Sequence, residues 1–191
     1  MNVLVLNGIA KENSGLDAVS CAICSTFQSA DCPTSVFRLR DHHIAPCVGC
    51  YSCWTKTPGM CVIDDDARDI AGRFISSDLV VFLCEITYGG YSYELKKALD
   101  RMIPLISPLF HKVNREVHHQ PRYDKYPSIL AVGILVEPDQ LDVEIFHRLA
   151  GRNAVNFDCP SYASVVLDAH SAATAVTSEV HSFLKKAGGI S

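Results

Sequence analysis

The feature that most constrains the fold is a regular alternation between short aliphatic segments and longer segments with helical periodicity. The aliphatic segments occupy residues 2–8, 34–41, 78–86, 128–136 and 161–169. The segments with apolar residues at helical spacing occupy residues 16–30, 64–76, 93–103, 138–155 and 172–189. A short, continuously aliphatic run is typical of a parallel strand that is buried on both faces. The alternation therefore predicts βαβ units, with helices on both faces of a parallel sheet.

Five strands in a chain of 191 residues favour an α/β, flavodoxin-like three-layer sandwich over a six-stranded dinucleotide fold. The predicted strand order is 2-1-3-4-5. We expect a single domain over residues 1–191, with a cysteine-rich loop at 47–61. The segment at about 107–127 does not follow the alternation and is predicted to be an insertion between the third helix and the fourth strand. Insertions of this length are usually functional or interfacial.

Composition and charge argue against several classes of function. Hydrophobic residues make up 48% of the chain and charged residues 20%, with a formal net charge of −4, so a nucleic-acid or anionic-membrane surface is not expected. No apolar run approaches the roughly 18 residues that a membrane span needs. The opening "MNVLVLNGIA" lacks the basic segment and cleavage site of a signal peptide. We therefore expect a cytoplasmic protein that binds neither nucleic acid nor membrane.

Two glycine-containing loops mark the expected ligand site, because ligands of open α/β sheets lie beyond the carboxyl ends of the strands where the strand order reverses. The loop after the first strand has the ingredients of a phosphate cradle, namely Gly8, Lys11, Asn13 and Ser14. The loop after the third strand could take a flat ligand through Gly89 and Gly90, with Tyr88 and Tyr91 packing near it. A phosphate at one end and a planar ring at the other favour flavin mononucleotide (FMN). A dinucleotide is disfavoured because no G-x-G-x-x-G follows the first strand.

Four of the nine cysteines form a C-x2-C-x2-C-x7-C motif, at Cys47, Cys50, Cys53 and Cys61. Cytosolic thiols are kept reduced, so such a cluster indicates metal binding or catalysis before structural disulfides. Three thiolates at this spacing can bind one iron–sulfur cubane, and the fourth completes its ligand set. Zinc sites more often pair two C-x2-C units. A [4Fe-4S] cluster, zinc, and free or disulfide-bonded thiols all stay open from the residues alone. Because the loop follows the second strand, we expect it at the same sheet edge as the flavin.

The chain resembles a known family at these two kinds of loop. The stretch "TYGGYSYELKKALDR", residues 87–101, is similar to the flavin-ring loop of the NADPH-dependent FMN reductases. The cysteine stretch "PCVGCYSCWTKTPGMC" resembles the loop of the iron–sulfur flavoproteins in that superfamily. The similarity covers essentially the whole chain, including "HHQPRYDKYPS". It implies a flavodoxin-like fold, bound FMN, a homodimer or homotetramer, and electron transfer through the flavin.

The resemblance also implies site residues. The flavin-ring loop corresponds to Glu85, Ile86, Thr87, Tyr88, Gly89, Gly90, Tyr91 and Ser92. The phosphate loop corresponds to residues 8–16, including Gly8, Lys11, Asn13, Ser14, Gly15 and Leu16. Ile9 and Leu16 stand where the family usually has hydroxyl donors, which predicts weaker phosphate binding, partly offset by Lys11. The implied [4Fe-4S] ligands are the four cysteines of the motif. The carboxylates at 64–66 are interpreted as a helix start rather than a metal triplet.

The first hypothesis for function is an FMN-dependent oxidoreductase or electron-transfer flavoprotein with a [4Fe-4S] cluster. NAD(P)H or a reduced partner would supply electrons, and a small-molecule acceptor or a redox partner protein would receive them. The first alternative is a cluster-free NAD(P)H-dependent FMN or quinone reductase. The second is a non-catalytic electron carrier or redox-sensing module. No nucleophile–base–acid arrangement is evident, and none is required where a flavin carries the chemistry.

Overall fold

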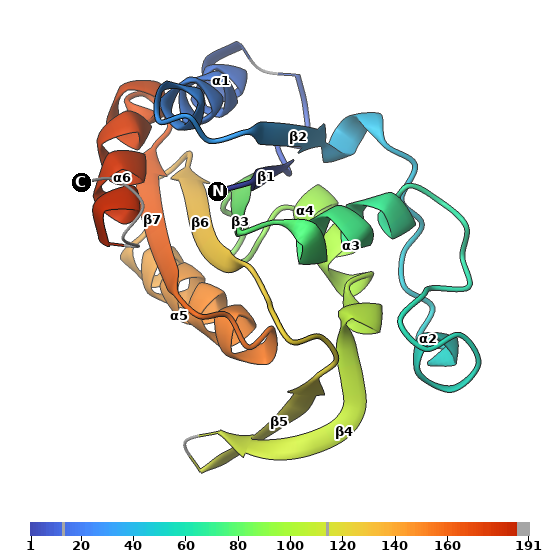
Figure 1. Cartoon of the computed structure of the whole chain (residues 1–191). Helices are drawn as coiled ribbons and strands as arrows, with labels where there is room; N and C mark the ends of the chain where they lie inside the picture. Colours follow the sequence, from blue (N-terminus) through green and yellow to red (C-terminus); the bar gives the residue numbers. More distant parts are fainter. Residues whose placement is uncertain (13, 114, 187–191) are drawn as a thin grey trace.

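The computed structural model describes residues 1–12, 14–113 and 115–186. At its centre lies a five-stranded sheet in which neighbouring strands run parallel, in the order β2-β1-β3-β6-β7 (Figure 1). The strands are β1 (Val3–Asn7), β2 (Thr34–Arg38), β3 (Leu79–Glu85), β6 (Ser128–Leu135) and β7 (Tyr162–Asp168). Because β4 and β5 lie outside this sheet, β6 and β7 are its fourth and fifth strands along the chain. The strand order is therefore the predicted 2-1-3-4-5, and the flavodoxin-like prediction is confirmed.

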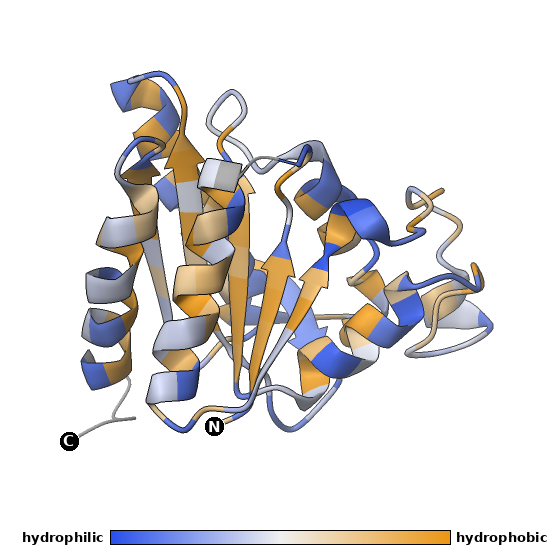
Figure 2. Ribbon diagram, turned by 90° about the horizontal axis from the view of Figure 1, so that it is seen from above, coloured by the Kyte–Doolittle hydropathy of each residue, from blue (hydrophilic) through white to orange (hydrophobic). Residues whose placement is uncertain are grey.

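Helices cover both faces of the sheet, as the alternation predicted. On one face α1 (Ser14–Ser29) and α6 (Ala172–Lys186) pack in one hydrophobic cluster. On the other face α3 (Ala67–Ser76), α4 (Tyr93–Asp100) and α5 (Gln140–Asn156) pack in a second cluster. Figure 2 shows the strands of the central sheet as mainly hydrophobic and many hydrophilic residues on the helices and loops.

Successive side chains of a strand point to opposite faces of the sheet. The side chains of each central strand are therefore divided between the two hydrophobic clusters. In β1, Val3 and Val5 pack toward α1 and α6, whereas Leu4 and Leu6 pack toward the other helices. All five residues of β1 are buried. Burial on both faces explains why the sequence shows a continuous aliphatic run here instead of an alternating one.

The segment predicted as an insertion forms an antiparallel hairpin that projects away from the sheet (Figure 1). It consists of β4 (Ile106–Val113) and β5 (Glu116–Pro121). Most of its side chains are exposed or half-buried, so hydrophobic periodicity did not identify these strands. Short elements that the periodicity also missed are η1 (Leu39–Asp41), α2 (Ser52–Thr55) and η2 (Ile103–Leu105). Within the described ranges, no helix has the length and apolar character to cross a membrane.

Candidate functional site

The two predicted flavin loops are joined directly at Gly8 and Ser92. The backbone N–H of Gly8 donates to the carbonyl of Leu83 at 2.7 Å, which extends the β1–β3 pairing into the loop. The Ser92 hydroxyl donates to the Gly8 carbonyl at 2.5 Å and accepts from the Leu95 N–H at 3.4 Å as the cap of α4. These hydrogen bonds place the two loops side by side, and they also engage the Ser92 hydroxyl within the protein.

The flavin-ring loop contains a two-residue turn between Thr87 and Gly90. The N–H of Thr87 donates to the Gly90 carbonyl at 3.0 Å, and the reverse hydrogen bond is 2.9 Å. Tyr88 and Gly89 both have positive φ, at 50° and 71°. The Tyr88 side chain is 92% exposed. A non-glycine residue with positive φ is uncommon, so this turn presents an aromatic ring and a backbone edge to whatever binds at the carboxyl end of β3.

Gly89 has no room for a side chain, and this gives a testable prediction. A Cβ at Gly89 would lie 2.6 Å from the Cβ of Ile145, and its φ is positive. We expect Gly89→Ala to lower the free energy of unfolding by about 1–3 kcal/mol and to weaken FMN binding by displacing the turn. Chemical denaturation and flavin titration measure the two effects. Gly90→Ala is the matched control, because its nearest neighbour is a single carbonyl oxygen at 3.3 Å; equal effects of the two variants would contradict the argument.

The Tyr91 side chain, which the sequence suggested would pack near a flat ligand, lies mostly within the hydrophobic core. Its ring is buried, edge-on to Phe82 and Phe146, and its hydroxyl accepts a hydrogen bond from the Asn153 amide at 3.0 Å. Burial raises the pKa of the Tyr91 hydroxyl well above its usual range. The side chain therefore belongs to the hydrophobic core, and only the backbone of residue 91 remains part of the loop.

The phosphate loop already holds one anionic contact within the protein. The backbone N–H of Ala10 donates to the Glu85 carboxylate at 3.2 Å. The Asn7 side chain accepts from the Ile9 N–H at 3.0 Å, while its buried Nδ2 has no hydrogen-bond partner within the described ranges. A loop N–H oriented toward an anionic oxygen and an unpaired amide donor are the chemistry that a phosphate group requires. These residues fit an FMN phosphate, and sequence reasoning missed both Asn7 and the carboxylate of Glu85.

Arg40 holds the outer side of the same loop. It forms a bidentate ion pair with Asp17 at 3.0 and 3.2 Å, and its Nη1 lies 3.5 Å from the Ile9 carbonyl and 3.4 Å from the Lys11 carbonyl. The hydrogen bonding of Arg40 to the Asp17 carboxylate is the main cause of the raised pKa of Arg40. Arg40 comes from η1 after β2, a segment that the sequence marked only as the end of a strand.

The other predicted phosphate-loop residues occupy different positions. Lys11 is exposed, Ser14 and Gly15 begin α1, and Leu16 is buried against the core. Asn13 lies outside the described residues. The structure thus brings Gly8, Glu85 and the backbone near Lys11 together, and it uses Leu16 as core.

The four cysteines of the motif converge on one cavity of about 210 Å³. Its walls also include Ile63, Arg101, Ile103 and Pro104. Cys53 is buried, Cys61 is half-buried, and Cys47 and Cys50 are exposed. All nine cysteines lie in described parts of the chain and are free thiols. Thiols that lie up to 14 positions apart in the sequence thus line one cavity, as they must if several of them are to bind one metal group.

Tight backbone turns shape this cavity. Gly49, Tyr51 and Gly59 have positive φ values of 63°, 54° and 87°. Burial raises the pKa of the Cys53 thiol, and the charges of the other three motif cysteines raise it further. Hydrogen bonding from Ser52 lowers the pKa of Cys50. The thiols are therefore close enough to influence one another electrostatically.

The four thiols of the cavity are not grouped around one point. Within residues 1–12, 14–113 and 115–186, no three His, Cys, Asp or Glu side chains are grouped to hold one ion, so the zinc interpretation gains no support. A cubane places a different requirement on its ligands, because its thiolates bind separate irons and so need not surround one point. The cavity supplies the ligand type that this requirement names, four cysteine thiols in one wall lining.

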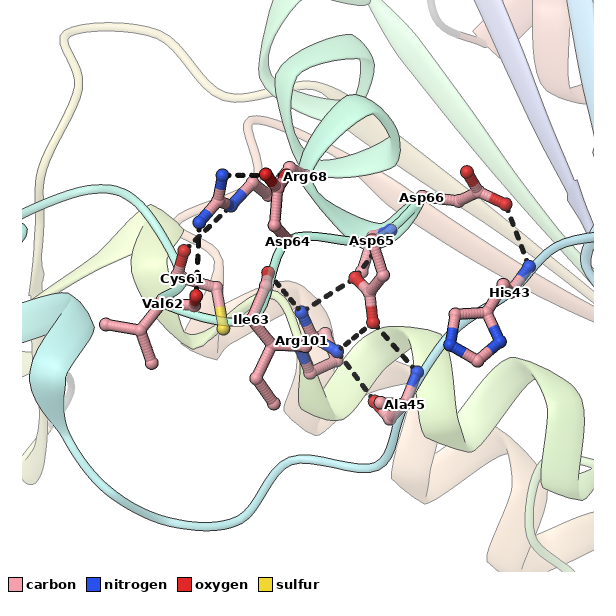
Figure 3. A network of polar contacts seen from close by, with 11 residues as sticks. His43, Ala45, Cys61, Val62, Ile63, Asp64, Asp65, Asp66, Arg68 and Arg101 are labelled. Carbon is pink, nitrogen blue, oxygen red and sulfur yellow. Dashed lines mark hydrogen bonds and ion pairs between the residues drawn. The ribbon is translucent and has the colours of Figure 1, made fainter.

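A buried arginine clamps the two ends of the cysteine segment (Figure 3). Arg101, the residue after α4, forms a bidentate ion pair with Asp65 at 2.7 and 2.8 Å. It also donates to the carbonyls of Ala45 at 2.7 Å and Ile63 at 3.2 Å. Burial alone would raise the pKa of Asp65, but hydrogen bonds from Arg101 and from the N–H groups of Ala45 and Ala67 bring it below its ordinary value. The segment is thus ordered by the protein alone.

Two further contacts secure the segment. Arg68 Nε donates to the Cys61 carbonyl at 2.9 Å, and Arg68 Nη1 pairs with the Asp64 carboxylate at 2.8 Å. Trp54 Nε1 donates to the carbonyl of Ile106 at 3.0 Å. Asp64 and Asp65 therefore do more than begin a helix: each pairs with an arginine. Sequence reasoning missed Arg101, because an arginine at a helix end usually serves only as a cation at the carboxyl terminus.

The thiol cavity and the flavin-ring loop lie at opposite ends of α4, which corrects the expectation that they share a sheet edge. Ser92 caps the start of α4, whereas Arg101 and Pro104 of the cavity follow its end. Eight helical residues span about 12 Å. The cysteine segment leaves the carboxyl end of β2 as expected, but it then runs to the far end of α4, where Arg101 holds it.

Comparison with known proteins gives three kinds of match. The model of the NADPH-dependent FMN reductase family matches residues 1–133, more than two thirds of the chain. An iron–sulfur flavoprotein of Methanocaldococcus jannaschii is 35% identical over 72 residues, which cover 38% of this chain and 36% of that protein. The chain therefore matches only about a third of the length of this curated relative.

Solved structures share the fold at low sequence identity. An azoreductase from Bacillus anthracis superposes with a TM-score of 0.70 at 14% identity, covering 97% of this chain and 99% of that one. An NAD(P)H:quinone oxidoreductase from Methanothermobacter marburgensis superposes with a TM-score of 0.68 at 12% identity, covering 95% and 94%. These similarities agree with the flavodoxin-like architecture.

Proposed function

The chain belongs to the NADPH-dependent FMN reductase family, and on that premise we propose that it is an FMN-dependent oxidoreductase with a [4Fe-4S] cluster on Cys47, Cys50, Cys53 and Cys61. The observation that carries the proposal is the convergence of these four thiols on one cavity. The relative named as an iron–sulfur flavoprotein supports the cluster. FMN, when bound, accepts hydride and passes on single electrons. The donor is NAD(P)H, and the acceptor is a small molecule or a redox partner protein.

The residues at the carboxyl ends of β1 and β3 would hold FMN. The Asn7 amide and the Ala10 N–H would face the phosphate, and the Glu85 carboxylate must then release the Ala10 N–H. The backbone of the turn from Thr87 to Gly90 would face the ring system. Because a carboxylate competes with the phosphate at this loop, we expect modest FMN affinity.

A cluster-free NAD(P)H-dependent FMN or quinone reductase is the second candidate, and one observation favours it. Arg101 and Arg68 hold the cysteine segment in place through backbone carbonyls and carboxylates, so the segment does not need a cluster in order to fold. The thiols would then be free. We further propose that the protein assembles as a homodimer or homotetramer, which sedimentation velocity measures.

The absorption spectrum of anaerobically purified protein, together with iron and acid-labile sulfide contents, tests the proposal. Flavin bands with a broad shoulder that bleaches with dithionite are expected. Flavin bands alone in iron-replete protein would support the cluster-free candidate instead. Adding NADPH or NADH should bleach the flavin rapidly; absence of bleaching with both would indicate an electron carrier or redox-sensing module.

Cys50→Ala gives a direct test of the ligand set. We expect it to remove the iron and sulfide while leaving FMN bound, because the thiol cavity and the flavin loops lie at opposite ends of α4. Cys21→Ala is the matched control, since Cys21 is an exposed thiol on α1 outside the motif. Metal analysis and flavin absorbance measure both variants. Full iron content in Cys50→Ala would contradict the four-cysteine ligand set.

A further inference from the structure

Arg101 has one buried hydrogen-bond donor without a partner in good hydrogen-bond geometry among the described residues. Its side chain is buried, at 2% exposure for the residue. Its two terminal nitrogens donate to Asp65, Ala45 and Ile63. Its Nε–H has no hydrogen-bond partner in the described part of the chain. A buried donor without a partner costs about 1–3 kcal/mol, so its retention calls for a physical explanation.

This donor belongs to a residue in the wall of the thiol cavity. Arg101 lines the cavity together with the four motif cysteines. In Figure 3 the Cys61 side chain lies beside the guanidinium group. Burial lowers the pKa of Arg101, whereas hydrogen bonding to Asp65, the charges of Cys61 and Asp65, and a weaker hydrogen bond to the Cys61 side chain raise it above its ordinary value. The group next to this donor is therefore a sulfur atom, which accepts more strongly as a thiolate than as a thiol.

We propose that Arg101 is a positioning residue for the cluster: its Nε–H donates a hydrogen bond to the Cys61 sulfur when that sulfur binds iron. This inference rests on the proposed function. One terminal nitrogen of Arg101 binds the Ala45 carbonyl, two residues before Cys47, and the other binds the Ile63 carbonyl, two residues after Cys61. The same guanidinium therefore sets the distance between the two ends of the ligand segment and leaves Nε facing the ligand.

The hydrogen bond has an electronic consequence. Hydrogen bonds to cluster sulfurs are among the factors that set reduction potential. A reduced cluster carries one more negative charge than an oxidised one, so a donor stabilises the reduced form more strongly. Arg101 therefore raises the reduction potential of the cluster and makes it a better electron acceptor from the flavin.

Arg101→Lys separates this role from the ion pair. Lysine keeps a cation that can reach Asp65, but it places a methylene group where arginine has Nε. We expect a lower midpoint potential in a titration followed by electron paramagnetic resonance, or loss of iron with FMN retained. Arg68→Lys is the control, because Arg68 contacts the Cys61 carbonyl and not the cavity; its potential should shift less. An unchanged potential and full iron content in Arg101→Lys would overturn the proposal.

A second measurement does not depend on the folding of Arg101→Lys. Protein with the Arg68→Lys substitution is labelled with ¹⁵N-arginine, and the reduced cluster is examined by pulsed electron paramagnetic resonance. A coupling to ¹⁵N is expected, because Arg101 is then the labelled arginine that lines the cavity. A cluster without this coupling would overturn the role of Arg101 alone. Absence of a cluster from wild-type protein would overturn the proposed function as well.

Discussion

Asp65→Ala should lower the free energy of unfolding by about 3–5 kcal/mol, because it leaves the buried Arg101 cation without its partner. Both side chains of this pair are essentially inaccessible to solvent. The substitution also removes the acceptor of the Ala45 and Ala67 N–H groups. Urea denaturation measures the change. We expect the cysteine segment to lose its order as well, with loss of any bound iron.

The neighbouring carboxylate provides the control. Asp64 pairs with Arg68 at 2.8 Å, but its side chain is 84% exposed, and exposed pairs contribute only about 0–1 kcal/mol. Asp64→Ala should therefore leave stability nearly unchanged. If the two variants were equally stable, the buried ion pair would not be the main constraint on the segment.

The Asp65 pair also predicts a pH dependence. The pKa of Asp65 is lowered in the folded state, so its contribution to stability is present above the unfolded pKa of about 3.9. It is lost as the pH falls through the still lower folded pKa. The difference in stability between wild type and Asp65→Asn should therefore be constant from neutral pH down to mildly acidic pH, and should shrink under strongly acidic conditions.

Gly8→Ala should have the second large effect, because it affects both flavin loops at once. A Cβ at Gly8 would lie 2.6 Å from the Leu95 Cβ and 2.9 Å from the Ser92 hydroxyl oxygen. Neither atom can move without shifting the start of α4. Forcing an extra group into a packed site costs about 1–3 kcal/mol. We expect a comparable loss of stability, and FMN binding weakened roughly tenfold or more, which corresponds to about 1.4 kcal/mol.

Thermal unfolding and flavin titration measure these two effects. Gly72→Ala is the control, since a Cβ at this position in α3 would meet nothing within 4 Å. Alanine in the interior of a helix is favoured over glycine by about 0.5–1 kcal/mol, so this variant should be slightly stabilised. If Gly8→Ala bound FMN as tightly as wild type, the joint between the loops would not contribute to the flavin site.

Sequence reasoning predicted the sheet because burial leaves a local signal. The strands β1, β3 and β6 are buried on both faces, and their aliphatic runs are visible without any knowledge of their neighbours. The hairpin of β4 and β5 leaves no such signal, because most of its side chains face solvent. The same limit applies to α2, whose four residues are too short for a helical period.

The tight turns of the two candidate flavin loops were predicted for a similar reason. Glycines after buried strands indicate tight turns, and Gly8 and Gly89 do lie where a Cβ would collide with a neighbour. The roles of the side chains were not predictable. Tyr91 enters the core, Ser92 bonds to Gly8, and Glu85 binds the Ala10 N–H. Each of these roles depends on a partner from another part of the chain.

The sequence by itself determined the alternating α/β architecture, its strand order and the four-cysteine motif, because hydrophobic periodicity and short-range spacing are local properties. Only the tertiary structure decided where the thiols lie. Arg101 and Asp65 are 36 positions apart, and no local pattern pairs them. Their burial together draws the cysteine segment from the carboxyl end of β2 to the far end of α4. The physical reason is that a buried charge must find its counter-charge, wherever in the chain that residue lies.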